Sequence, residues 1–288
     1  MEPQKLTFES ADGVRLNGTV FTPEQPPKAI VILNGATGVP ERFYRHFAAW
    51  LAEARGLACV TYTYRDMEDT SPKAMRRSRV TMRNWGIDDA QLVRDTVRAR
   101  FPGVPIWMIG HSIGGMLMSK QPSLEGISRA ITVASGLVSH KEHPMPYRAA
   151  VWLFWFVLGP LGIRAVGYLP GETIRLGSTV PSTVFWQWRK WCTSGEAGFL
   201  ADDSLPRSDW SQSEAPVRII AMTDDPICPP ATAFRLERAF PGAREVQKVA
   251  LDPAREGVKE LGHLSVFRPA AAAYWPDIID DDRDAPGA

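Results

Sequence analysis

The feature that most constrains the fold of this chain is a series of short apolar runs that do not alternate with polar residues. A run such as 29–33, Ala-Ile-Val-Ile-Leu, is typical of a strand buried on both faces, as in a parallel sheet. Amphipathic segments of helix length separate these runs. This order predicts an α/β fold with a mostly parallel central sheet and helices on both faces. The expected strands are 29–33, 57–60, 106–109, 130–133 and 217–221, and the expected helices are 41–55, 88–101 and 231–240.

Other segments depart from this rhythm. Residues 6–10 and 14–20 alternate apolar with polar residues around Asp12-Gly13, which predicts an added antiparallel hairpin. From 137 to 209 there is no clear strand but there are five tryptophans, and Pro-Gly pairs are expected to cut the segment into short helices. We interpret it as a helical lid inserted into one core domain. The domain parts are 1–136 (core), 137–209 (lid), 210–276 (core) and 277–288 (an acidic, disordered tail).

Composition excludes several function classes. The 288 residues are 44% hydrophobic and 23% charged with a formal net charge of +1, which favours a globular protein and gives no support for a nucleic-acid or anionic-membrane partner. Three cysteines without metal-ligand spacing predict neither a disulfide framework nor a zinc site, so we expect a reducing, cytoplasmic location. No cofactor motif is present, and none is expected.

One apolar run, 149–163, bears on membrane association. At about fifteen residues it is shorter than the ~18–20 that a transmembrane helix requires. The beginning of the chain, Met1-Glu-Pro-Gln-Lys-Leu6, has no apolar core of the kind that a signal peptide needs. We therefore expect a buried or interfacial helix and no stable membrane insertion.

A nucleophile motif follows the third expected parallel strand. Gly110-His111-Ser112-Ile113-Gly114 lies between an apolar strand and a helix-compatible segment. At such a strand–turn–helix junction, a serine is held in a strained conformation that exposes its Oγ, and small residues two before and two after it let strand and helix pass closely. The alternative is a chance match, but the strand–turn–helix context favours Ser112 as a nucleophile.

Serine needs a base, and the chain order nucleophile, acid, histidine identifies one. His263 follows the last expected strand, 245–251, by a loop, whereas the other four histidines lie where packing or pocket-lining roles are expected. The acid should follow the preceding strand, where Asp224 and Asp225 are adjacent. We favour Asp225, in the third position after the strand, and expect Asp224 to brace the turn.

Together, Gly110-His111-Ser112-Ile113-Gly114, Asp225-Pro-Ile-Cys-Pro and Gly262-His263 resemble the α/β-hydrolase superfamily over nearly the whole chain. The resemblance implies an oxyanion hole formed by the N–H of Ile113 and that of Ala36, with Thr37 as the alternative to Ala36. Asn34 stands where the family commonly has histidine, and the stretch from Tyr62 to Ser71 lacks the family's usual glycines.

Four further segments are similar to a group of bacterial predicted hydrolases of unassigned substrate. They are Gly167-Tyr-Leu-Pro-Gly171, Trp188-Arg-Lys-Trp191, Asp224-Asp225-Pro226 and Gly262-His263-Leu-Ser-Val-Phe-Arg268.

The main functional prediction is a serine hydrolase that cleaves an ester or thioester of a small, apolar acyl substrate through an acyl-enzyme on Ser112. An acyltransferase or cyclase would use the same residues and differ only in what reaches the acyl-enzyme first. A third possibility is a ligand-binding protein on a hydrolase scaffold, and the complete Ser112, Asp225 and His263 set argues against it.

Overall fold

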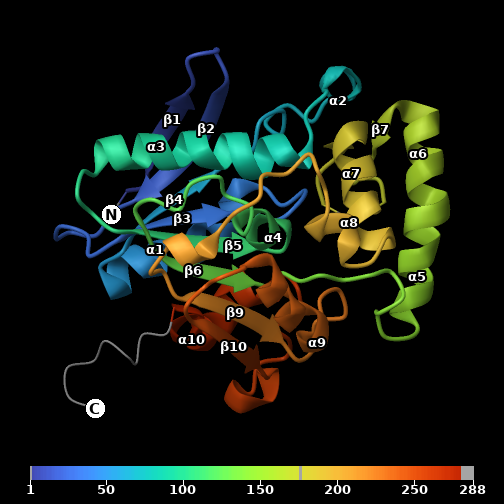
Figure 1. The fold of residues 1–288 in the computed structure, drawn as a ribbon. Helices are drawn as coiled ribbons and strands as arrows, with labels where there is room; N and C mark the ends of the chain where they lie inside the picture. Colours follow the sequence, from blue (N-terminus) through green and yellow to red (C-terminus); the bar gives the residue numbers. More distant parts are fainter. Residues whose placement is uncertain (1, 175–176, 280–288) are drawn as a thin grey trace.

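The computed structural model describes residues 2–174 and 177–279. Its centre is an eight-stranded sheet in the order β1-β2-β4-β3-β5-β6-β9-β10 (Figure 1). In it β2 pairs antiparallel with both β1 and β4, and all the other neighbouring strands pair parallel. The strands are β1 Gln4–Glu9, β2 Arg15–Phe21, β3 Ile30–Asn34, β4 Ala58–Tyr62, β5 Ile106–His111, β6 Ile127–Val133, β9 Val217–Met222 and β10 Val246–Leu251. The expected parallel sheet and the expected edge hairpin are both present.

Helices cover both faces of this sheet, as the unbroken apolar runs require. In β3, Ile30 and Ile32 pack in one core while Val31 and Leu33 pack in the other. The first core lies under α3, and the second lies under α1 and the C-terminal α10 (Figure 1). The helices of the core are α1 Arg45–Arg55, α2 Pro72–Arg77, α3 Ala90–Arg100, α4 Ile113–Met118, α9 Pro230–Ala233 and α10 Trp275–Ile279.

The expected helices are shorter than the sequence pattern indicated, because their ends adopt other helical forms. A 3₁₀ turn at Glu41–Tyr44 precedes α1, a π-helical turn at Asn84–Asp89 precedes α3, and a 3₁₀ segment at Phe234–Ala239 follows α9. The expected tail begins later than 277, since residues 277–279 belong to α10, where Ile278 and Ile279 are buried. Residues 280–288 of that tail lie outside the described residues.

The segment 137–209 forms a separate group of helices beyond the carboxyl ends of the parallel strands (Figure 1). We call it the insertion. It contains a two-stranded ladder that its sequence did not indicate, with two residues in each strand. Its elements are α5 Tyr147–Leu153, α6 Gly159–Val166, β7 Tyr168–Leu169, β8 Val180–Pro181, α7 Ser182–Thr193 and α8 Ala197–Leu200.

The insertion begins with one continuous helix, not the short helices expected from its Gly159-Pro160 pair. α5, a π-helical turn at Phe154–Leu158 and α6 join into a 20-residue helix, Tyr147–Val166. A proline inside a helix removes one backbone donor, and a change of hydrogen-bonding pattern beside it accommodates this loss. Among the described residues this is the one helix long and apolar enough to cross a membrane by length and composition. The expectation that the run falls short of that length was therefore wrong.

Candidate active site

Ser112 occupies the junction between β5 and α4, where the sequence placed it. Its backbone has φ +54° and ψ −118°, a region that costs a non-glycine residue about 1–3 kcal/mol. The surrounding glycines make this geometry accessible. A Cβ on Gly110 would collide with the backbone of Gly115, and one on Gly114 would collide with the backbone of Asn34. Strand, helix and oxyanion loop therefore pass one another at contact distance around the serine.

The structure brings together the three side chains that the sequence selected. His263 Nε2 lies 2.9 Å from Ser112 Oγ, and His263 Nδ1 lies 2.8 Å from Asp225 Oδ2. Because an ionised carboxylate can only accept, Nδ1 carries a proton and donates it to Asp225. Nε2 of the neutral ring is then free to accept the hydroxyl proton of Ser112. This is the geometry that a nucleophile, its base and a group that orients the base require.

Asp224 and Asp225 have different partners, although they are adjacent in the sequence. Asp225 is buried, and its second oxygen accepts the backbone N–H groups of Ile227 and Cys228 at 2.8 and 3.1 Å. Asp224 instead accepts the backbone N–H groups of Leu261 and Gly262, both at 2.9 Å. Asp225 therefore contacts the ring of His263, while Asp224 holds the loop that carries it. Asp225 thus has the position relative to His263 that the sequence-based preference for it requires.

Electrostatics keeps Asp225 ionised. Burial alone would raise the pKa of this carboxyl, but the neighbouring His263 and the hydrogen bonds from His263 and two backbone amides outweigh burial, so the pKa is lowered. The pKa of Cys228, in the same loop, shifts in the opposite direction. Burial and the negative charge of Asp225 raise the pKa of its thiol well above the ordinary value. It stays a protonated thiol, which is a poor nucleophile.

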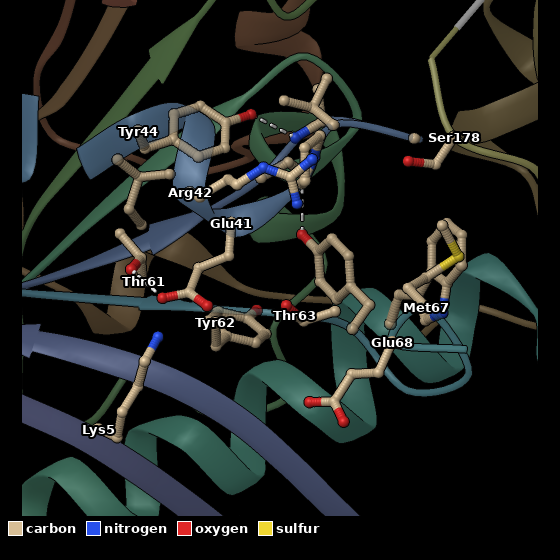
Figure 2. Close-up of a pocket in the computed structure, with 18 residues that line it drawn as sticks. Lys5, Glu41, Arg42, Tyr44, Thr61, Tyr62, Thr63, Met67, Glu68 and Ser178 are labelled. Atoms are coloured by element: carbon tan, nitrogen blue, oxygen red, sulfur yellow. Dashed lines mark hydrogen bonds between the residues drawn. The ribbon is translucent and has the colours of Figure 1, made fainter. Parts of the chain in front are cut away.

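The candidate oxyanion loop, residues 34–38, follows β3, and tyrosines brace it from behind. Tyr62 donates to Asn34 Oδ1 at 2.8 Å, and Tyr64 donates to the carbonyl of Gly35 at 3.0 Å. Both tyrosines line a cavity of about 340 Å³ that adjoins the loop, and Figure 2 labels Tyr62 in it. The sequence indicated only that this stretch lacks the family's glycines. The spacing of two residues between the tyrosines was the available signal, because it places both rings on one side of an extended segment.

A third tyrosine bears on the choice between Ala36 and Thr37. The N–H of Ala36 donates to Tyr44 Oη at 2.9 Å, a bond drawn in Figure 2, so this donor is engaged within the protein. Thr37 also lines the cavity beside Ser112, and its N–H forms no hydrogen bond with another described residue. The geometry therefore favours the alternative, Thr37, over Ala36. Ile113, the other expected donor, is the first residue of α4, where a backbone N–H has no partner within its helix.

His111 connects this loop to the base, a link that sequence reasoning missed. Its Nε2 lies 2.8 Å from the carbonyl of His263 and its Nδ1 lies 2.8 Å from Tyr44 Oη. Because a carbonyl only accepts, Nε2 carries the proton, and the Tyr44 hydroxyl then donates to Nδ1. A chain of hydrogen bonds thus runs from Ala36 through Tyr44 and His111 to the backbone of His263. Burial, followed by the proximity of His263, lowers the pKa of His111 to about 3, so its ring is neutral.

A cavity of about 430 Å³ opens above Ser112 and His263. The insertion supplies much of its wall, including Trp155, Trp188 and Trp191. His143 also lines it, as expected, with its Nδ1 3.0 Å from the carbonyl of Pro226. His140, the other histidine of this segment for which a pocket-lining role was expected, is not among the lining residues. The walls are therefore mainly aromatic and aliphatic, with Glu196 and His143 among the few polar residues that line them.

Comparisons with known proteins agree with this description. The model of the alpha/beta hydrolase family matches residues 30–273. Among curated proteins, none matches this chain. A monoglyceride lipase from Saccharomyces cerevisiae has a similar structure, with TM-score 0.65 and 17% identity over 98% of this chain and 95% of that one. A carboxyl esterase from Bacillus coagulans gives TM-score 0.55 and 18% identity over 88% and 90% of the two chains.

A thioesterase domain from the curacin biosynthetic pathway is similar as well, with TM-score 0.56 and 15% identity over 97% of this chain and 100% of that domain. At such low identities these structures establish the fold alone. The family match spans the β3 loop, Ser112, Asp225 and His263 in one uninterrupted range. The chain therefore belongs to the alpha/beta hydrolase family, with the fold that its sequence predicted.

Proposed function

We propose that this protein is a serine hydrolase that cleaves an ester or thioester of a small apolar acyl substrate. The observation that carries the proposal is the unbroken series of hydrogen bonds from Ser112 through His263 to Asp225, at the floor of an aromatic-lined cavity. Nucleophile, base and orienting acid within hydrogen-bond reach are what acyl transfer through a covalent intermediate requires.

The proposed reaction begins when His263 Nε2 takes the proton of Ser112 Oγ and the oxygen attacks the acyl carbon. The carbonyl π electrons move onto the acyl oxygen, and the N–H groups of Ile113 and Thr37 would stabilise the resulting charge. Collapse of this intermediate expels the alcohol or thiol, to which His263 returns the proton. Water then enters, gives its proton to His263 and attacks the acyl-enzyme, and the reverse proton transfer releases the carboxylic acid and restores Ser112.

The apolar lining of the cavity supports an apolar acyl substrate. Each acyl methylene that leaves water and packs against apolar walls stabilises the bound substrate by about 0.8 kcal/mol. The similar structures are named as a monoglyceride lipase from yeast, a carboxyl esterase from Bacillus coagulans and a thioesterase domain from the curacin pathway. These names support ester or thioester bonds as the first to test. The three cysteines are free thiols, in keeping with a reducing, cytoplasmic location.

Covalent labelling tests the proposal. A fluorophosphonate should modify wild-type protein at Ser112, and the Ser112→Ala variant should stay unlabelled. Labelling should become far slower in a His263→Ala variant, because the hydroxyl then lacks its base. A panel of p-nitrophenyl esters, thioesters and amides should show turnover of the first two classes. An unlabelled wild-type protein that still binds apolar ligands would instead identify a binding protein on a hydrolase scaffold.

A further inference from the structure

We infer that the outer face of the Tyr147–Val166 helix adsorbs to the surface of a lipid bilayer that carries anionic headgroups. Large apolar side chains on this side of the insertion are unusually exposed, including Trp152 at 51%, Leu161 at 56% and Trp186 at 43%. Apolar patches of this kind on a folded domain mark an interaction surface. We define the outer face as Trp152, Leu153, Phe156, Leu158, Leu161 and Trp186.

The aromatic members of the outer face form one continuous surface. Trp152 and Phe156 are stacked with ring centroids 5.5 Å apart. The guanidinium of Arg189 lies 4.9 Å from the centroid of Phe156 and 5.8 Å from that of Trp186. The patch therefore extends from the helix across to α7, with a cation placed between its rings. Tryptophan rings beside arginines suit the boundary between acyl chains and headgroups, where one side is apolar and the other hydrated.

The opposite face of the same helix is already occupied. Val151, Trp155 and Gly159, spaced four residues apart, are buried, and the first two line the cavity above Ser112. The backbone carbonyl of Trp155 accepts Arg189 Nε at 2.7 Å, which fastens the helix to α7. A helix that is apolar all round is ordinarily covered all round. Here only 11% of its most apolar 18-residue window is buried, so the uncovered side needs a partner.

This packing distinguishes adsorption from insertion. The helix has the length to span a bilayer, but spanning would remove Val151 and Trp155 from the cavity wall and break the contact with Arg189. Lying flat in the interface keeps the inner contacts and covers only the outer face. In Figure 1, α5 and α6 form the edge of the molecule, farther from the sheet than α7, so no other element lies between this face and a planar surface.

The net charge of +1 for the whole chain gave no support for an anionic membrane, but the local charges on this helix identify that kind of bilayer. The only charged residues in Tyr147–Val166 are Arg148 and Arg164, about 24 Å apart at 1.5 Å per residue. Both are exposed, and neither forms an ion pair with a described residue. The nearby acidic Glu142 is paired with Arg235 at 2.7 Å. Glu172 is exposed in the turn after β7. Two arginines without an acidic partner among the described residues, at the ends of an apolar strip, would meet anionic headgroups on both sides of it.

The same charges disfavour a second copy of this chain as the occupant. With a two-fold axis along this helix the two copies would be parallel, and each of the two arginines would face its own counterpart. With the axis perpendicular to the helix the copies would be antiparallel. Arg148 of one copy would then lie beside Arg164 of the other, without an acidic residue on either helix to compensate. Like charges brought together in this way oppose association.

Adsorption would also deliver substrate. Tyr147 and Ala150 of this helix line the cavity, together with the exposed Ile227 and Leu264. An acyl ester dissolved in the bilayer could therefore pass along apolar side chains to Ser112. This delivery step rests on the proposed function, whereas adsorption itself does not and can be measured without turnover.

Flotation with lipid vesicles tests adsorption. Wild-type protein should float with vesicles of phosphatidylcholine and phosphatidylglycerol at a ratio of 7:3, and more weakly with phosphatidylcholine alone. Trp152→Ser/Leu161→Ser should lower the partition coefficient at least tenfold on both. Arg148→Gln/Arg164→Gln should remove the preference for the anionic lipid. The matched control Arg15→Gln/Arg45→Gln, which removes the same charge from exposed positions of the core, should bind as wild type does.

Turnover of a water-soluble short ester provides a folding control, because neither Trp152 nor Leu161 lines the cavity. It should be unchanged in the Trp152→Ser/Leu161→Ser variant, and near-ultraviolet circular dichroism gives the same control if no ester is turned over. A wild-type monomer that floats with neither vesicle would overturn the inference. So would a wild-type dimer, measured by light scattering, that the Trp152→Ser/Leu161→Ser variant dissociates, since the face would then join two copies.

Discussion

Asp224 and Asp225 hold the same histidine in two ways, one through the backbone of the two residues before it and the other through its ring. Asp224 accepts two backbone N–H groups of the loop immediately before His263, while Asp225 accepts the ring N–H itself. Adjacent carboxylates that face opposite directions can divide this task because successive side chains of an extended segment point to opposite sides.

The two aspartates should therefore differ sharply when each is replaced by asparagine. Asp225→Asn should lower kcat by about 10⁴, because an amide favours the wrong histidine tautomer. Asp224→Asn keeps one acceptor oxygen for the loop, so we expect a far smaller loss of kcat and a stability loss of about 1 kcal/mol. Steady-state kinetics and urea unfolding of both variants test this. An inactive Asp224→Asn protein beside an active Asp225→Asn protein would reverse the two assignments.

Substitutions of Ser112 should separate strain from chemistry. Ser112→Ala and Ser112→Gly should both be inactive and folded, but the glycine variant should be more stable than the alanine variant by about 1 kcal/mol, because only glycine adopts φ +54° without steric cost. Thermal unfolding measures the difference. Equal stabilities would show that the backbone at this position stores no strain.

Tyr44→Phe should disturb the active site without touching substrate. It leaves the N–H of Ala36 and the Nδ1 of His111 without their shared partner, so we expect a stability loss of about 1–3 kcal/mol together with a lower kcat and a nearly unchanged KM. The matched control is Tyr274→Phe. Tyr274 is also buried, and its hydroxyl likewise accepts a backbone N–H, from Glu256, and donates to a backbone carbonyl, that of Asp252. The control should lose similar stability and keep kcat, and equal kcat losses in both variants would argue against the hydrogen-bond chain.

His111 should make the protein acid-sensitive. Its pKa is lowered from 6.5 to about 3 by burial, so the folded state keeps the ring neutral while the unfolded state binds a proton below pH 6.5. The unfolded state then binds more protons than the folded state. The free energy of unfolding should therefore fall by up to about 1.4 kcal/mol for each unit by which the pH is lowered between these two pKa values. Above pH 7 His111 is neutral in both states and does not contribute to the pH dependence of the free energy of unfolding.

A His111→Gln variant isolates this contribution. The difference in unfolding free energy between variant and wild type should be constant above pH 7. Below pH 6 it should change progressively in favour of the variant, as measured by urea unfolding at several pH values. Curves that run parallel from pH 8 to pH 4 would contradict a neutral, buried His111.

Substitutions of two tryptophans should distinguish a role in substrate binding from a role in core packing. Trp188 lines the cavity, so Trp188→Ala should shift the preferred acyl chain length of p-nitrophenyl esters of two to ten carbons. Wild type should gain up to roughly fourfold in kcat/KM for each added methylene until the cavity is full, corresponding to about 0.8 kcal/mol. Trp210 is fully buried against Phe240, outside the cavity lining, so Trp210→Ala should lower the melting temperature and leave the chain-length profile unchanged. A wild-type profile without any chain-length preference would indicate a polar substrate.

The sequence was most informative where one local rule determines the outcome. Unbroken apolar runs predict parallel strands, and Gly110 to Gly114 predict the sharp turn at Ser112, because burial and close backbone approach act on neighbouring residues. Chain order then selected His263 and Asp225. The bonds of Tyr44 could not be predicted in this way. They depend on the 3₁₀ turn at Glu41–Tyr44 and on partners that the fold brings from β3 and β5.

In the long helix of the insertion, by contrast, a local sequence signal predicted a break that the structure does not have. Gly159-Pro160 ordinarily marks a break, yet the helix continues because a π-helical turn precedes the proline and Gly159 packs closely against Phe185. The same helix carries apolar residues on two faces. A one-dimensional pattern does not reveal which face the rest of the molecule covers.

The groups proposed for bond cleavage all follow the carboxyl ends of β3, β5, β9 and β10. They lie outside the insertion between β6 and β9, which shares the cavity wall with core residues such as Met116 and Leu264. The proposed catalytic groups and much of the cavity wall are thus encoded in separate stretches of the gene. Mutations within 137–209 can accumulate, or the whole stretch can be exchanged for that of a relative, while the hydrogen-bonded series at Ser112 keeps its geometry. Such a division allows a lineage to change its substrate without first losing its catalyst.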